Sequence, residues 1–117
     1  MPLANPFENP RPLREFLARL AGLPRHCWLY VPTTVTEITL ETPCYATRFD
    51  SRDLSPEEQD EFDSFVEQTG MRSLLCVPQL EEVQANLNIQ HPEFSLGNLA
   101  DAVDFYWKHD AFVDLSG

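Results

Sequence analysis

The sequence is short of basic residues and of long apolar runs, and each shortage excludes a class of protein. Eight Lys and Arg stand against 19 Asp and Glu, so the formal net charge is −11. Nucleic acids and anionic membrane surfaces are bound through clusters of Lys and Arg, and we therefore expect neither as a direct partner. No run of about 20 apolar residues is present, which excludes a membrane-spanning helix. A basic protein partner suits this composition better.

Cysteines are also few, and their spacing excludes the usual cysteine-based frameworks. Cys27, Cys44 and Cys76 are odd in number and far apart, and none belongs to a C-x-x-C pair. Neither a disulfide framework nor a zinc ribbon is therefore indicated, and buried structural thiols in a reducing compartment are the expected alternative. The N-terminal stretch MPLANPFENPRPL lacks a basic segment followed by an apolar one. We therefore expect a cytoplasmic protein.

What is present indicates one globular domain. The chain has 117 residues, of which 43% are hydrophobic and 11% aromatic, unlike a disordered acidic tail. Residues 1–11 contain three X-Pro steps, which favour extended backbone, and we expect an N-terminal arm docked through Phe7. Residues 12–117 are expected to form a single α/β or α+β domain.

Hydrophobic periodicity predicts seven elements in the order α-β-β-α-β-α-α. They are a helix over 12–22, strands over 27–31 and 44–49, a helix over 55–69, a strand over 73–77, a helix over 79–88 and a helix after Ser95. The second and third strands flank a helix, which favours a right-handed β-α-β crossover. We therefore predict a small, mostly parallel three-stranded sheet covered on both sides by four helices.

The most unusual segment is DSRDLSPEEQDEFDSFVEQT, residues 50–69, with eight carboxylates and a single arginine. Ser55, Pro56 and Glu58 form a capping box that begins a helix, and Gly70 ends it. Helical spacing turns Phe62 toward the core and the acids toward water. Such a face is most simply solvated surface, but its charge density favours a surface for a basic partner. The residues proposed to bind this partner are Asp53, Glu57, Asp60, Glu61, Asp63 and Glu67.

No catalytic, cofactor or metal site is indicated by the motifs. A calcium loop beginning at Asp50 would place Pro56 at its seventh position and has no glycine at its sixth. The three histidines lack ligand spacing, and G-x-S-x-G is absent. Four glycines in the whole chain offer no phosphate-cradling loop. We therefore do not expect an enzyme.

The C-terminal segment DFYWKHDAFVD, residues 104–114, contains four aromatic residues. Its simplest interpretation is a core helix with Lys108 and His109 at its negative end. An exposed ring there, such as Trp107, could instead anchor a protein interface.

Three segments carry a resemblance to a known family: LYVP at 29–32, ETPC at 41–44, and the run from Val77 to Phe112 that ends in YWKHDAF. The chain resembles a family of small, acidic bacterial proteins of unknown function. Some members are thought to be immunity proteins of contact-dependent growth inhibition and related polymorphic toxin systems. The resemblance implies no catalytic residue and does not extend to the acidic helix.

Two functions are therefore carried forward. In the first, an immunity protein neutralises a cognate toxin by stoichiometric binding through the acidic helix. We expect this toxin to have a basic surface and to be a nuclease. Nuclease clefts must be basic to hold phosphates, so an acidic helix suits them. In the second, a non-catalytic regulatory or adaptor module binds its partner through the aromatic C-terminal helix.

Overall fold

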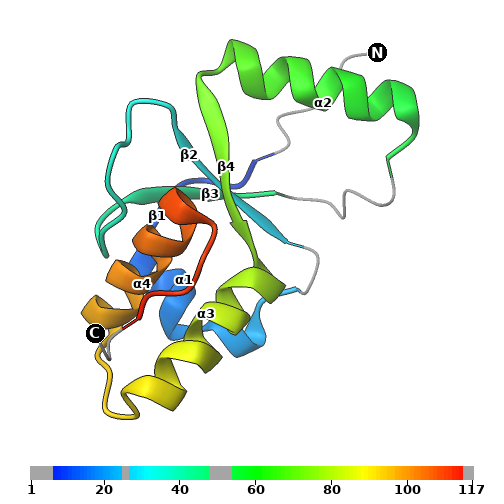
Figure 1. Cartoon of the computed structure of the whole chain (residues 1–117). Helices are drawn as coiled ribbons and strands as arrows, with labels where there is room; N and C mark the ends of the chain where they lie inside the picture. The colour runs from blue at the N-terminus through cyan, green and yellow to red at the C-terminus, as the bar shows by residue number, and fades with distance from the viewer. Residues whose placement is uncertain (1–6, 25–26, 48–53, 115–117) are drawn as a thin grey trace.

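The computed structural model describes residues 7–24, 27–47 and 54–114. Its sheet consists of β1 (Arg11–Pro12), β2 (Trp28–Pro32), β3 (Pro43–Ala46) and β4 (Met71–Cys76). The helices are α1 (Leu13–Ala18), the 3-10 helix η1 (Leu20–Gly22), α2 (Pro56–Gln68), α3 (Val77–Gln90) and α4 (Leu96–His109). The fold is α+β (Figure 1).

The sheet corrects the predicted topology. Four strands lie in the order β1-β3-β2-β4, and every neighbouring pair is antiparallel, so the prediction of a mostly parallel three-stranded sheet is wrong. β3 and β4, which flank α2 in the chain, do run in the same direction because both are antiparallel to β2. However, β2 lies between them and takes the hydrogen bonds that a parallel pair would have formed.

A β-bulge contributed to the error. Leu74 and Leu75 are successive residues of β4, yet both are buried. The register shifts between Trp28 and Tyr30 of β2, so that three residues of β4 span the distance of two on β2. A bulge interrupts the alternation of side chains between the two faces. The apolar run in β4 therefore reflects this bulge, whereas a run of that kind is also typical of a parallel strand covered on both faces.

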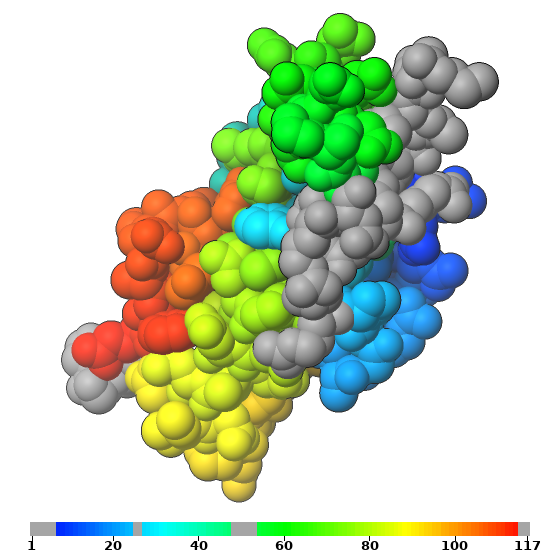
Figure 2. All heavy atoms as spheres, turned by 90° about the vertical axis from the view of Figure 1, so that its right-hand side faces the viewer, coloured from blue at the N-terminus to red at the C-terminus, as the bar shows by residue number. Residues whose placement is uncertain are grey.

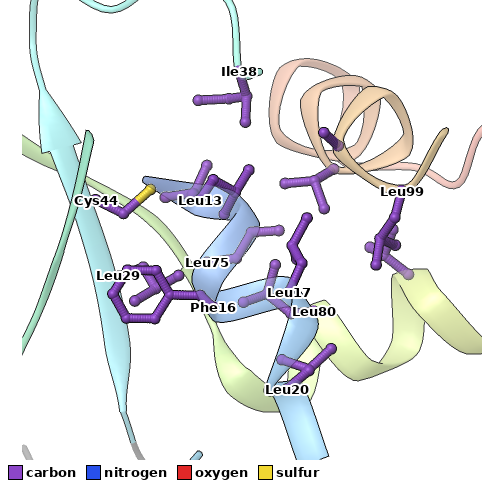
Figure 3. Packing of buried hydrophobic residues seen from close by; sticks show 14 of the residues in the cluster. Leu13, Phe16, Leu17, Leu20, Leu29, Ile38, Cys44, Leu75, Leu80 and Leu99 are labelled. Carbon is purple, nitrogen blue, oxygen red and sulfur yellow. The ribbon is translucent and has the colours of Figure 1, made fainter. Parts of the chain in front are cut away.

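The main core lies on one face of the sheet, beneath α1, α3 and α4 (Figure 1). Alternation in the two inner strands turns Leu29 and Val31 of β2, and Cys44 of β3, into it. Figure 3 shows side chains from α1, β2, α3 and α4 meeting in this cluster, among them Leu13, Leu29, Leu80 and Leu99.

The helix caps predicted from the sequence are present in the structure. Ser95 caps α4 by accepting a hydrogen bond from the backbone N–H of Asn98, at 3.1 Å. Gly70 ends α2 with a positive φ of 69°, which a residue without Cβ adopts at little cost. Leu96, whose spacing from Leu99 and Val103 in the sequence predicts an inward position, is instead 37% exposed in the first turn of α4.

Only part of the expected N-terminal arm falls within the described residues, which begin at Phe7. Phe7 is 4% exposed and forms a β-bridge with Thr47, and the Glu8 N–H donates to the Ala46 carbonyl at 2.8 Å. Residues 7–12 thus run antiparallel to β3, and their pairing with it begins at Phe7, before β1 itself.

Candidate partner-binding surface

α2 is a well-capped helix of 13 residues. The Ser55 hydroxyl accepts from the Glu58 N–H at 3.2 Å, and the Glu58 carboxylate accepts from the Ser55 N–H at 3.0 Å. These two bonds satisfy orphan donors at the helix start, and the acids of the first turn suit its positive dipole end. The last turn has no basic residue and carries Glu67, whose charge the negative end disfavours.

An aromatic cluster attaches α2 to the face of the sheet opposite the main core. The ring of Phe7 lies 5.2 Å from Tyr30, 6.1 Å from Tyr45, and 5.9 Å from both Phe62 and Phe65, measured between centroids. Tyr30 meets Phe62 edge-on at 5.7 Å. Such tilted and edge-to-face pairs are the favoured geometries of aromatic contacts. Phe7 and Phe62 are buried, yet neither belongs to the main cluster, so α2 rests on a separate, smaller core.

Burial in this cluster also acts on the phenol of Tyr30. Desolvation raises its pKa, and the nearby carboxylate of Asp63 raises it further because a phenolate there would be repelled. The hydroxyl therefore stays neutral under ordinary conditions, as suits its place beneath an acidic helix.

The outward face of α2 carries the predicted partner-binding carboxylates. Glu57, Asp60, Glu61, Asp63 and Glu67 are all exposed. Asp63 accepts a hydrogen bond from the Gln59 amide at 3.0 Å. The side-chain carboxylates of the other four form no hydrogen bond or ion pair with a described residue. Asp53, the remaining predicted residue, lies outside the described residues.

The ion pairs that the structure does describe lie away from this helix. They join Arg11 to Glu15, Arg14 to Glu41, and Lys108 to Asp104. Figure 2 shows α2 in green at one end of a molecule whose extents are 51 × 27 × 23 Å. In Figure 1, α2 lies at the end of the molecule away from α3 and α4.

The aromatic helix of the second hypothesis is largely occupied by contacts within the chain. The Trp107 indole N–H donates to the Ser73 carbonyl of β4 at 3.2 Å, and the Arg72 guanidinium lies 4.2 Å from the centroid of the Trp107 ring. Tyr106 packs against Phe112 at 5.4 Å. Phe112 itself is 42% exposed. Trp107 thus closes the outer edge of β4 rather than presenting a free ring.

The cysteines are structural in character. Cys27 and Cys44 are buried, and Cys76 is half-buried. Burial raises the pKa of Cys44 to about 12, so its thiol remains protonated and poorly nucleophilic. Desolvation likewise raises the pKa of Cys27. Within residues 7–24, 27–47 and 54–114, no group of three or more His, Cys, Asp or Glu is arranged to hold a metal ion.

Comparison with known proteins places the chain in a family. Residues 10–115 match the domain of unknown function DUF7716, and the chain belongs to this family. No curated protein and no solved structure matches it. The family description names no activity or partner, and it carries no link to immunity proteins. None of the helices in the described part of the chain is long and apolar enough to cross a membrane.

The sequence indicated that Phe7 docks the N-terminal arm and that Phe62 faces inward, but it did not predict that the two meet in a separate core beneath α2. Tyr30 and Tyr45 alternate with the buried Leu29 and Cys44 on adjacent strands. That alternation is the signal of a second packed face, but it does not identify Phe7 as the residue that fills the centre of the cluster.

Proposed function

We propose that this protein binds a basic protein partner in one-to-one stoichiometry through the acidic face of α2, and that it acts as an immunity protein in the cytoplasm. The partner is a toxin domain of the nuclease class. The observation that carries the proposal is the set of four exposed carboxylates, Glu57, Asp60, Glu61 and Glu67, without an ion-pair partner among the described residues.

The arrangement of these charges costs stability within the chain. Glu57 with Glu61, and Asp63 with Glu67, are like-charge pairs at i, i+4, and each destabilises a helix by about 0.2–0.5 kcal/mol. Glu67 adds an unfavourable interaction with the helix dipole. A basic surface bound to this face would offset the repulsion between the carboxylates and the unfavourable interaction of Glu67 with the helix dipole. The negative potential of the helix would also accelerate association with a basic partner and favour that partner over others.

The surroundings of α2 offer more than charge. A pocket of about 240 Å³ lies beside its C-terminal half, lined by Phe7, Phe65, Thr69 and Met71 among others. Stable interfaces bury roughly 800 Å² on each partner and draw most of their affinity from a few side chains seated in pockets. One helix face supplies only part of that area. A partner residue in this pocket would supply the apolar contact that the charges lack.

The nuclease class follows from chemistry. A nuclease must present a basic cleft to hold phosphates, and carboxylates spaced along a helix can occupy such a cleft in place of the nucleic acid. The immunity role itself rests on the resemblance noted in the sequence analysis, since the description of the DUF7716 family names no role. The intramolecular contacts of Trp107 give less support to the adaptor alternative, because a partner would have to displace them.

The test is co-expression with the product of the neighbouring upstream gene, followed by purification of any complex and binding measurements over a salt series. We expect a one-to-one complex that weakens with salt, and rescue of cells from that product's toxicity. Reversal of Asp60, Glu61 and Glu67 to Lys should abolish both.

The matched control reverses three other exposed acids, Glu37, Glu82 and Glu93, to Lys. Both triple variants change the formal charge of the chain from −11 to −5. The proposal requires that only the α2 variant lose binding and protection. Equal losses of binding and protection in the two variants would show that net charge alone is responsible. A neighbouring gene product that is not toxic and does not bind would refute the immunity role.

A further inference from the structure

A second hollow lies away from α2, between the last turn of α3, the outer face of α4 and the segment that follows α4. Its volume is about 570 Å³, within the range of roughly 300–1,000 Å³ typical of small-molecule sites. In Figure 1 these elements occupy the end of the molecule opposite α2. The hollow is therefore independent of the proposed partner-binding surface.

The walls of this pocket are apolar and are held in place by contacts within the chain. Leu87 of α3, Phe105 of α4 and Val113 of the C-terminal segment supply them. The Phe105 ring packs on the His109 ring at a centroid distance of 4.4 Å. The Gln90 amide donates to the Val113 carbonyl at 2.7 Å and ties the C-terminal segment to α3.

The polar lining consists of Asp101, Asp104, Asn98 and His91, so its only formal charges with His91 neutral are negative. Asp101 and Asp104 lie three residues apart on α4 and both line the pocket, which no Lys or Arg lines among the described residues. Asp104 is already engaged, since it accepts from the Ile38 N–H at 2.8 Å and lies 3.0 Å from the Lys108 ammonium. Asp101 is exposed and has no hydrogen bond or ion pair involving a described residue.

We propose that this pocket binds an organic cation, a primary ammonium or guanidinium carried on an apolar body. Asp101 is the anionic contact, and the ring of Phe105 contributes apolar packing and attraction for the cation. An anionic ligand would meet two carboxylates on a chain of net charge −11. A neutral apolar ligand would desolvate Asp101 without compensation. Only a cation with an apolar body satisfies both halves of the lining.

The test compares two probes of similar shape on the isolated chain, 3-phenylpropylamine and the neutral 3-phenylpropanol, by titration of ¹H–¹⁵N spectra. We expect the amine to shift resonances of Asn98 to Phe105 and of Val113, and the alcohol to bind about tenfold more weakly because it carries no positive charge to pair with Asp101. The variant Asp101→Asn should weaken the amine about tenfold and weaken the alcohol much less, because only the amine loses an ion pair.

The matched control is Glu82→Gln, which removes the same charge from an exposed position of α3 that does not line the pocket. It should leave amine binding unchanged. Equal affinity of amine and alcohol, an equal loss in Glu82→Gln and Asp101→Asn, or shifts centred on α2 would each overturn the proposal. The comparison of probes on the unaltered chain does not depend on the folding of either variant, and it requires no protein partner.

Discussion

Removal of the Phe7 side chain should loosen α2 while leaving the main core folded. Phe7 is 4% exposed and contacts the rings of Tyr30, Tyr45, Phe62 and Phe65. A buried Phe→Ala change costs about 3–5 kcal/mol, because transfer free energy and the cavity left behind both count. A domain of this size is stable by roughly 5–15 kcal/mol. The variant Phe7→Ala should therefore stay folded but be clearly destabilised.

The location of the loss distinguishes this account from ordinary core damage. Since the cluster around Phe7 is separate from the main core, α2 should open locally at lower free energy than α4. Native-state hydrogen exchange should show protection falling across the amides of 58–68, while Leu99 and Val103 exchange only by global unfolding. Urea unfolding followed by Trp28 and Trp107 fluorescence gives the global free energy.

The control for this prediction is Phe112→Ala, which removes a ring that is 42% exposed and should cost about 1 kcal/mol or less. Equal destabilisation by the two variants would refute the role given to Phe7. So would an equal loss of protection in α2 and α4, since it would show that the two helices share one cooperative core.

Three further predictions concern local chemistry. Ser55→Ala removes the capping box of α2 and should lower the free energy of unfolding by about 1 kcal/mol in urea, whereas Ser55→Gly should cost less. Gly70→Ala has room for its Cβ, 3.7 Å from the Thr33 hydroxyl, so a loss of about 1–2 kcal/mol should come from the φ of +69° alone, and no measurable loss would contradict this reading. The buried thiol of Cys44, with its pKa raised to about 12, should resist alkylation in the native state longer than half-buried Cys76. Because an unfolded Cys ionises near pH 8.5, the contribution of Cys44 to stability is complete below that pH and should fall as the pH rises toward 12. The raised pKa values of Cys27 and Tyr30 add losses of the same sign, so Cys44→Ala should reduce the decline of the unfolding midpoints across that range without removing it.

Local chemistry explains why the helices could be predicted from the sequence. The Ser55 and Ser95 caps, the Gly70 stop, and the orientation of Phe62 inward and Glu61 outward all depend on residues within a few positions of one another. An acidic surface on α2 follows from the same periodicity, since a 3.6-residue repeat decides which side chains share a face.

Strand pairing and cavities depend on distant segments, and only the tertiary structure decided them. Alternation shows that a strand buries one or both faces, but it does not name the neighbouring strand, so the insertion of β2 between β3 and β4 had no local signal. The place of Phe7 beneath α2 and the pocket beside Asp101 likewise require segments far apart in the chain to meet. The sequence by itself determined the helices and their charge. The packing of the whole chain determined which residues each face contacts, because strand pairing and close packing depend on segments that meet only in the folded chain.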